Sequence, residues 1–306
     1  MNGQLLILVT TLVGASIAWA GEPHSARDRP PHIAISVARQ PSAGFEDLTS
    51  TAKVESKEHQ VSAGLYRFDV GDAVFDFGVD YQYTRYEYEG ISGRNRDLHR
   101  LQTPLQFHLQ RSLWRLEGYL APGISTSSNI FKDLFKKASS DDVFVSARLE
   151  GRRSSHNRNW VIGLAYDRSF GEPSVYPVAG IELSPSDSLD VRLAFPDSGF
   201  RYQWSEGRSL IGRIFPAGHQ WHVVSDELND DFKYRVEAVR SQLSWTFRFW
   251  RQLSVDVSAG YEFGRSHHFT DDQNRRIDSD TRNQWLVAIG LRAGPAPLPY
   301  THGGQF

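Results

Sequence analysis

The chain has 306 residues, of which 40% are hydrophobic, and a formal net charge of −2. Its mean hydropathy of −0.45 and the lack of any later apolar run of about 18 residues exclude a bundle of membrane helices. The near-balance of charge gives no indication of a nucleic-acid partner. Cysteine is absent, which removes disulfides, thiolate metal sites and cysteine nucleophiles.

The first twenty residues have the form of a secretory signal. Residues 5–18 are an apolar core, and small residues at 18–20 precede Gly21, although no Lys or Arg precedes the core. The alternative is an uncleaved anchor helix, for which the apolar run is short. The expected organisation is a signal peptide at 1–20, a polar periplasmic lead-in at 21–31, a barrel at 32–294 and a C-terminal tail at 295–306.

Alternation of apolar and polar residues with a period of two runs through most of the chain. In "FDFGVDYQY", residues 75–83, Phe, Val and Tyr take one face and Asp, Gly and Gln take the other. No amphipathic helix of useful length is found, and the nearest candidate is 129–139. Similar strands are predicted at 101–110, 143–150, 189–195, 243–249, 253–263 and 284–294.

Short and long connections between these strands tend to alternate along the chain. The segment 151–159 fits least well, because it should be a short turn and has nine residues. Short turns at one end and long loops at the other are typical of an outer-membrane barrel. We predict an all-β, transmembrane, antiparallel up-and-down β-barrel of about 14 strands, with 12 also possible. Short connections are expected at 70–73, 110–113, 184–188, 205–208 and 249–252, and long ones at 40–53, 89–97, 123–141, 225–231 and 265–281.

The polar faces of the strands indicate which way the apolar faces point. A secreted soluble β-protein should carry Lys and Glu on these faces, but the chain has only 6 Lys against 28 Arg, and the faces hold Asp, Gln, Ser, Gly, Thr and Arg. We therefore expect the apolar faces to meet lipid, with aromatic girdles near 83–90 and 247–250. The predicted lumen-lining residues are Asp76, Asp80, Gln82, Arg115, Glu117, Arg148, Glu150, Asp190, Arg192, Arg240, Arg248, Asp256, Glu262 and Arg292.

One stretch resembles a known family. In "YPVAGIELSPSDSLDVRLAFPDSGFRYQWSEGRSLIGRIF", residues 176–215, a Gly-Ile strand, a Pro-containing turn, a strand closing on Phe-Pro and an aromatic strand follow in order. This order, together with "AGYEFGRS" at 259–266, is similar to a family of bacterial outer-membrane β-barrel proteins known only as a domain of unknown function. The resemblance covers 31–294 and implies the barrel fold and a diderm cell envelope. It implies no established activity, so no functional residue is carried over.

The sequence holds few candidates for chemistry. His219 and His222 should point to opposite faces of one strand, which is poor geometry for one metal. His267 and His268 precede Asp271 and Asp272 in an expected loop that could hold a divalent cation or be plain solvated loop. The acidic segment 225–231 lacks the spacing of a calcium loop, and His108 is interpreted as a hydrogen-bonding lumen residue. We expect no catalytic residues, no metal site and no cofactor.

The leading functional prediction is a porin-like channel for small solutes, with both termini in the periplasm. One alternative is an outer-membrane enzyme acting on lipid or lipopolysaccharide, which would need a Ser/His/acid cluster at a strand-end rim. The other is a structural or surface-interaction barrel that acts through the loops at 123–141 and 265–281. Expected partners are outer-membrane lipid, lipopolysaccharide and the barrel-assembly machinery. The oligomeric state, and the use of Phe306 as an assembly signal, stay open.

Overall fold

The computed structural model describes residues 32–46, 52–90, 95–155, 158–225, 230–271 and 276–294. The signal peptide, lead-in and C-terminal tail predicted at 1–20, 21–31 and 295–306 lie outside these residues. Within the described ranges, no helix has both the length and the apolar character needed to cross a bilayer.

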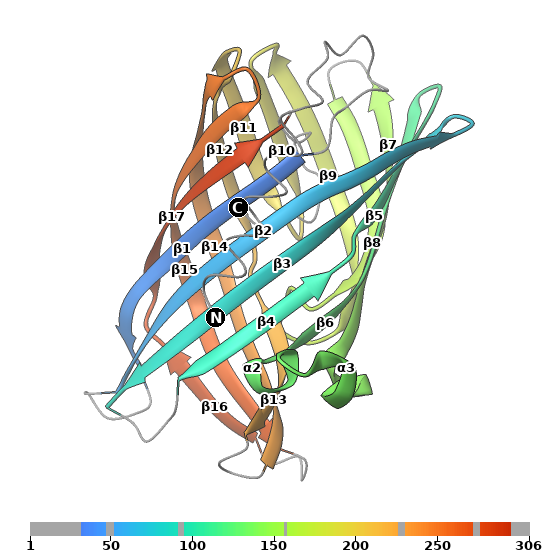
Figure 1. Cartoon of the computed structure of the whole chain (residues 1–306). Coiled ribbons are helices and arrows are strands. Elements are labelled where there is room, and N and C mark those ends of the chain that lie inside the picture. Colours follow the sequence, from blue (N-terminus) through green and yellow to red (C-terminus); the bar gives the residue numbers. More distant parts are fainter. Residues whose placement is uncertain are drawn as a thin grey trace.

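Seventeen strand segments and three short helical turns make up the described chain, and the strands tilt steeply around a common axis (Figure 1). In chain order they are β1 (His32–Gly44), β2 (Lys53–Val70), β3 (Ala73–Glu89), β4 (Arg96–Gln102), β5 (Leu105–Arg111), β6 (Trp114–Ser127), α2 (Ser128–Phe131), α3 (Leu134–Lys137), η1 (Ser140–Asp142), β7 (Val143–Ser155), β8 (Arg158–Asp167), β9 (Ser174–Ser186), β10 (Leu189–Phe195), β11 (Ser198–Ser205), β12 (Arg208–Pro216), β13 (His219–Ser225), β14 (Asp230–Trp250), β15 (Leu253–Asp271), β16 (Arg276–Thr281) and β17 (Gln284–Ala293).

The strands form one closed wall of antiparallel neighbours, in which β17 pairs back with β1. Three of the strands are interrupted, and each is recorded as two segments that pair with the same neighbour. β4 and β5 pair with β3, β12 and β13 pair with β14, and β16 and β17 pair with β15. Pro104 lies in the first interruption and Pro216 ends β12 at the second, as expected for a residue that cannot donate to a ladder. Seventeen segments therefore make fourteen strands, which confirms the predicted fold class.

The two ends of the barrel have different connections. At one end, just two residues separate β2 from β3, β5 from β6, β7 from β8, β9 from β10, β11 from β12 and β14 from β15. At the other end lie the longer connections, including the one that holds α2 and α3, together with a two-residue connection between β10 and β11 (Figure 1). We call them the short-turn end and the long-loop end. Two expectations are corrected: within 151–159, residues 151–155 and 158–159 are paired strand, and 265–281 is largely the paired strands β15 and β16 rather than a loop.

Apolar side chains lie on the outside of the wall and polar ones on the inside. Ile162 and Ile289 are 66% and 59% exposed, whereas Glu150 and Arg192, two buried ionisable residues, are 1% and 0% exposed. In the stretch 75–83, Phe77 is exposed and Gln82 is buried. An apolar exterior around a polar interior is the arrangement of a barrel whose outer face meets lipid.

Candidate functional site in the barrel lumen

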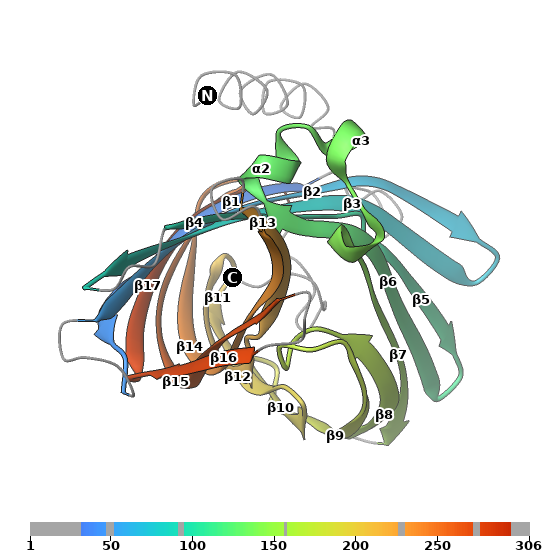
Figure 2. The same ribbon diagram turned by 90° about the horizontal axis from the view of Figure 1, so that it is seen from below.

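The barrel narrows at its long-loop end. Strands β2, β3, β14 and β15 have 18, 17, 21 and 19 residues, well beyond the roughly 9–11 that span a bilayer. There β13 has no pairing with β11 and instead bridges to β6 through His222 and Thr126, while Phe45 bridges to Thr281. The result is a smaller ring of β1–β4, β6 and β13–β16, beyond the ends of β7–β12 (Figure 2). We call it the narrow ring.

The narrow ring is filled by an aromatic core. Trp221 of β13 and Tyr234 of β14 are 1% and 0% exposed and stack with ring centroids 5.8 Å apart. The Tyr234 hydroxyl is 2.9 Å from the Tyr88 hydroxyl and 2.6 Å from Nδ1 of His267, so the buried polar atoms are joined in a chain. The buried members are Phe45, Ala52, Val54, Tyr86, Leu98, Trp221, Val223, Phe232, Tyr234 and Val236.

This core corrects the predicted aromatic girdle at 83–90. Tyr86 is 3% exposed, and Tyr88 packs against the core, so both point inward rather than to the lipid interface. The outer faces of the same strands carry charges instead: Lys57 lies 3.0 Å from Glu87, and Arg85 lies 2.8 Å from Glu87. Charged outer faces indicate that the narrow ring projects beyond the hydrocarbon layer.

A cluster of ion pairs lines one side of the lumen, on the inner faces of β6–β10. Glu150 of β7 accepts hydrogen bonds from Arg148, Arg152 and Arg192, the last of these at 3.2 Å from β10, three strands away around the wall. Glu117, Glu182 and Asp197 complete the set. Charges that are removed from water need such multiple pairing, so this cluster fixes the inner faces of β6–β10 relative to one another.

A second cluster lies on the opposite side of the lumen. Arg240 of β14 is 3.2 Å from Glu58 of β2 and also pairs with Glu262, although β14 and β2 are not neighbours in the wall. Arg265 is 3.3 Å from Glu262 and 2.8 Å from Gln284. The two clusters leave a polar space between them.

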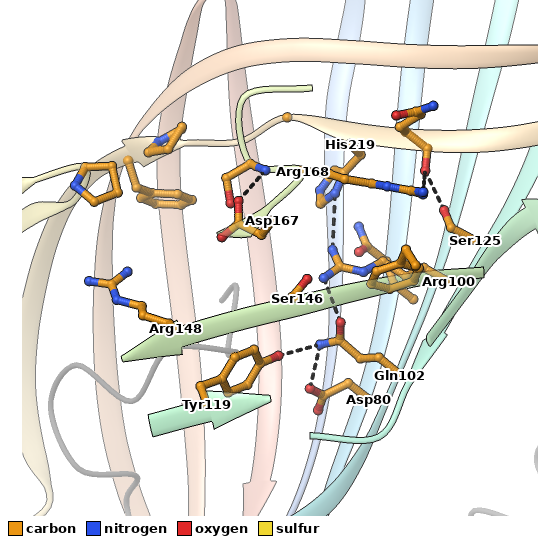
Figure 3. A pocket seen from close by; sticks show the side chains of 18 of the residues that line it. Asp80, Arg100, Gln102, Tyr119, Ser125, Ser146, Arg148, Asp167, Arg168 and His219 are labelled. Atoms are coloured by element: carbon orange, nitrogen blue, oxygen red, sulfur yellow. Dashed lines mark hydrogen bonds between the residues drawn. The ribbon is translucent and has the colours of Figure 1, made fainter. Parts of the chain in front are cut away.

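A polar cavity occupies the lumen beside the narrow ring (Figure 3). It has a volume of about 140 Å³ and lies under the short ends of β7–β12, where the β8–β9 and β10–β11 connections close over it. Gly218 fastens the β8–β9 connection to the start of β13, because its N–H donates to the carbonyl oxygen of Ser169 at 2.6 Å. The residues that line the cavity include Asp80, Arg100, Gln102, Phe144, Ala147, Asp167, Arg168, Asp197, Phe215 and His219.

Two arginines in this cavity share one aromatic ring. The guanidinium carbons of Arg100 and Arg168 lie 5.3 and 5.2 Å from the centre of the buried Phe144 ring. Arg100 donates to Gln102 at 2.8 Å and lies 3.2 Å from Nδ1 of His219. Arg168, in the β8–β9 connection outside any strand, has two long bonds, at 3.4 and 3.5 Å, to the carbonyl oxygens of Gln220 and Val143. Burial and the positive charge of Arg100 lower the pKa of Arg168 to about 10.

The acids of the cavity are paired with other groups. Asp80 accepts from Gln102 at 3.1 Å, Asp167 accepts from Tyr176 at 2.5 Å, and Asp197 accepts from Arg148 at 3.1 Å. Among the described residues, no carboxylate lies within 4 Å of the guanidinium nitrogens of Arg100 or Arg168. Arg100 and Arg168 are therefore held by amide, imidazole and backbone carbonyl groups rather than by a directly bonded carboxylate, and Gln102 links Arg100 to Asp80.

The residues predicted to line the lumen fall into several groups. Arg148, Glu150 and Arg192 meet in the first cluster with Glu117, Arg240 meets Glu262 in the second, and Asp80 and Gln82 line the cavity. Arg292 pairs with Asp256 at 2.7 Å on adjacent strands. Arg115 reaches the edge of the first cluster, 3.8 Å from Glu117. The other three contact residues outside the predicted set: Asp76 lies 3.7 Å from Arg67, Asp190 accepts from Ser184, and Arg248 lies 3.4 Å from Glu206.

The histidine candidates serve structural contacts. His267 and His268 lie within β15 rather than in a loop; His267 is in the aromatic core, and His268 is 2.5 Å from Asp278. His222 is 3.0 Å from Asp142 of η1, and His108 is 3.7 Å from Asp76. Within the ranges that the structure describes, no group of three or more His, Cys, Asp or Glu side chains could hold a metal ion.

One serine–histidine pair bears on the enzyme alternative. Nε2 of His99 is 2.7 Å from the Ser128 hydroxyl, and its Nδ1 is 2.8 Å from the Tyr81 hydroxyl. The Ser128 hydroxyl also lies 3.3 Å from the carbonyl oxygen of Asp97. The ring of Phe131 covers the imidazole, with centroids 4.3 Å apart. These contacts anchor α2 to β4.

Sequence reasoning predicted Arg148 of the cavity but missed Arg100 and Arg168. Arg100 lies two residues before Gln102, which falls on a polar face of 101–110, and extending that strand backwards would have found it. Arg168 follows the end of β8 in a connection, where no periodic pattern exists. Its approach to Phe144 depends on tertiary structure.

A closed wall of fourteen strands with an apolar exterior, a polar interior and a lumenal cavity defines an outer-membrane β-barrel. The chain belongs to the family described as "Domain of unknown function (DUF6268)", whose model matches residues 102–294. No curated protein matches the sequence.

Several solved structures are similar in fold. The COG4313 outer membrane channel from Pseudomonas putida F1 is 11% identical with a TM-score of 0.47, over 90% of this chain and 100% of that one. The Pseudomonas putida toluene transporter TodX is 10% identical with a TM-score of 0.37, over 88% and 90% of the two chains. The KdgM porin in complex with disordered oligogalacturonate is 8% identical with a TM-score of 0.37, over 86% and 99%.

Proposed function

We propose that this protein is an outer-membrane channel that admits small solutes through the polar half of its lumen. One observation carries the proposal: the cavity lies beside the filled narrow ring and under the short strands β7–β12. On that side, connecting segments rather than a packed core separate the lumen from the long-loop end. A polar inner wall provides the hydrated path that such a solute needs.

Conductance of single-cysteine variants tests this route, and the absence of native cysteine makes the labelling specific. Ser146 lines the cavity, so a bulky thiol reagent on Ser146→Cys should reduce the current through a planar bilayer severalfold. Asp72→Cys, in the turn between β2 and β3, is the matched control and should conduct equally before and after labelling.

Two results would contradict the channel. One is the absence of channel events from the purified protein at any voltage. The other is an equal effect of labelling at both positions, which would place the path outside the cavity.

A structural or surface-interaction barrel is the second candidate, and the filled narrow ring favours it. Trp221 and Tyr234 close the axis of the barrel with a core as tightly buried as that of a soluble domain. The same recordings separate the two candidates, because a structural barrel carries no current and is insensitive to a label at Ser146.

We also propose that the chain reaches the outer membrane by export, with cleavage after Ala20, insertion by the barrel-assembly machinery, and the short-turn end and both termini in the periplasm. The support is the apolar core at 5–18, followed by small residues, and the general placement of short turns in such barrels. Sequencing the protein from an isolated outer-membrane fraction should give Gly21 as its first residue. A chain beginning at Met1 in that fraction would contradict cleavage.

A further inference from the structure

We propose that the lumenal cavity binds a small organic acid, with its carboxylate between Arg100 and Arg168 and its apolar body against Phe144 and Phe215. The transport role of this site rests on the proposed channel function, whereas binding itself does not. The solute class would then be organic anions rather than neutral or cationic molecules.

The arginines of the cavity favour an anion. Arg100 and Arg168 approach the same ring, and the positive charge of Arg100 disfavours that of Arg168. Of the neighbouring acids, Asp197 is held by Arg148, while Asp80 and Asp167 accept from the neutral groups of Gln102 and Tyr176. An incoming carboxylate would pair directly with the two guanidinium groups and could accept paired N–H bonds from a planar guanidinium.

The two arginines differ in how firmly they are held. Arg100 is braced by Gln102 at 2.8 Å and by His219 at 3.2 Å, so its orientation is set before a ligand arrives. Arg168 has only bonds of 3.4 and 3.5 Å to backbone carbonyl oxygens, which a carboxylate can replace at small cost. One fixed and one adaptable guanidinium suit capture of a small anion.

The remaining wall of the cavity selects an organic ligand over an inorganic one. Phe144, Ala147, Pro196, Phe215 and Pro216 line the cavity with apolar atoms. Inorganic phosphate would leave these groups in water, whereas a compact hydrocarbon body attached to a carboxylate would cover them.

Isothermal titration of the purified full-length protein in detergent tests the site with benzoate, its neutral analogue benzamide, and inorganic phosphate. Benzoate should bind at least about tenfold more tightly than either of the others, a difference of about 1.4 kcal/mol. Arg168→Gln should abolish this preference, and Arg168→Lys should retain part of it because the positive charge remains. Arg248→Gln is the matched control, since it removes one lumenal arginine at the short-turn end and should leave binding unchanged.

Slower migration of the heated protein on a gel verifies that each variant has a folded barrel. Equal affinity for benzoate and benzamide, phosphate binding as tight as benzoate, or equal losses in Arg168→Gln and Arg248→Gln would each overturn the proposal. Failure of the channel function would appear separately, as benzoate binding without conductance. Conductance with no benzoate binding would overturn this inference and leave the channel intact.

Discussion

Replacing Trp221 by alanine is expected to unfold the narrow ring while the fourteen-stranded wall remains. Trp221 is 1% exposed and packs on Tyr86, Tyr234 and His219. Truncating a buried tryptophan costs about 3–5 kcal/mol through lost apolar contact and the cavity left behind. β13 has a full ladder with β14 but a single bridge to β6, so this loss falls on a unit that can open locally.

Hydrogen exchange of the protein in detergent measures this effect. Amide protons of β13 and of the β14 residues that pair with it should exchange roughly a hundredfold faster or more. This corresponds to a loss of about 3 kcal/mol in the free energy of local opening. Those of β8 and β9 should keep their protection. Trp250→Ala, which removes a 69% exposed side chain at the short-turn end, is the control. Uniform acceleration in all strands would show that the ring and the wall unfold as one unit.

Replacing Glu150 by glutamine is expected to destabilise the whole barrel. Glu150 is 1% exposed and accepts hydrogen bonds from three arginines. Removing one partner from a buried ion cluster leaves positive charge uncompensated in a site shielded from water, which costs about 3–5 kcal/mol. The remaining acids Glu117, Glu182 and Asp197 should keep the loss near the lower value.

Urea unfolding in lipid vesicles provides the measurement, with tryptophan fluorescence as the readout. Glu206→Gln removes a carboxylate that is 92% exposed in its pair with Arg248, and it should leave the unfolding midpoint unchanged. A Glu150→Gln protein as stable as the parent would mean that the cluster contributes nothing net to stability. In that case water must reach these arginines freely in the lumen.

Most of the wall could be predicted from sequence, because a period of two assigns every side chain of a half-buried strand to one face. The stretch 75–83 has its exposed Phe77 outside and its buried Gln82 inside for this reason. The strand interruptions could not be read in the same way. Residues 217–218 look like an ordinary turn, and only the pairing of both β12 and β13 with β14 identifies one continued strand.

The sequence contained a signal for the narrow ring, which the prediction of an aromatic girdle at 83–90 overlooked. In β3 the outward aromatics Tyr81 and Tyr83 occupy odd positions, whereas Tyr86 and Tyr88 occupy even ones. Because alternate residues of one strand point to opposite faces, this switch from odd to even positions means that the aromatic side chains point outward in the first part of β3 and inward in the second. Charged residues at odd positions, Arg85 and Glu87, mark the same point.

The cavity could be predicted only in part. The acids and arginines of regular strands follow from alternation, but their partners do not, because Arg192 meets Glu150 across two intervening strands. Arg168 and Phe144 come from a connection and from the second residue of β7. Their approach depends on how the β8–β9 connection folds over the barrel, which no local pattern encodes.

The closure of the narrow ring constrains the order in which the barrel assembles. Thr126 and His222, which join β6 to β13, are 96 residues apart, and Phe45 meets Thr281 from the opposite end of the chain. Contacts of such long range form slowly, because the intervening chain must be ordered first. We therefore expect the contact of β13 with β6 to form after β7–β12 have paired, and the ring to close when β15 and β16 bring Thr281 to Phe45. Until the ring closes, Trp221 and its neighbours lack the residues against which they pack, so burial of these aromatics reports that assembly is complete.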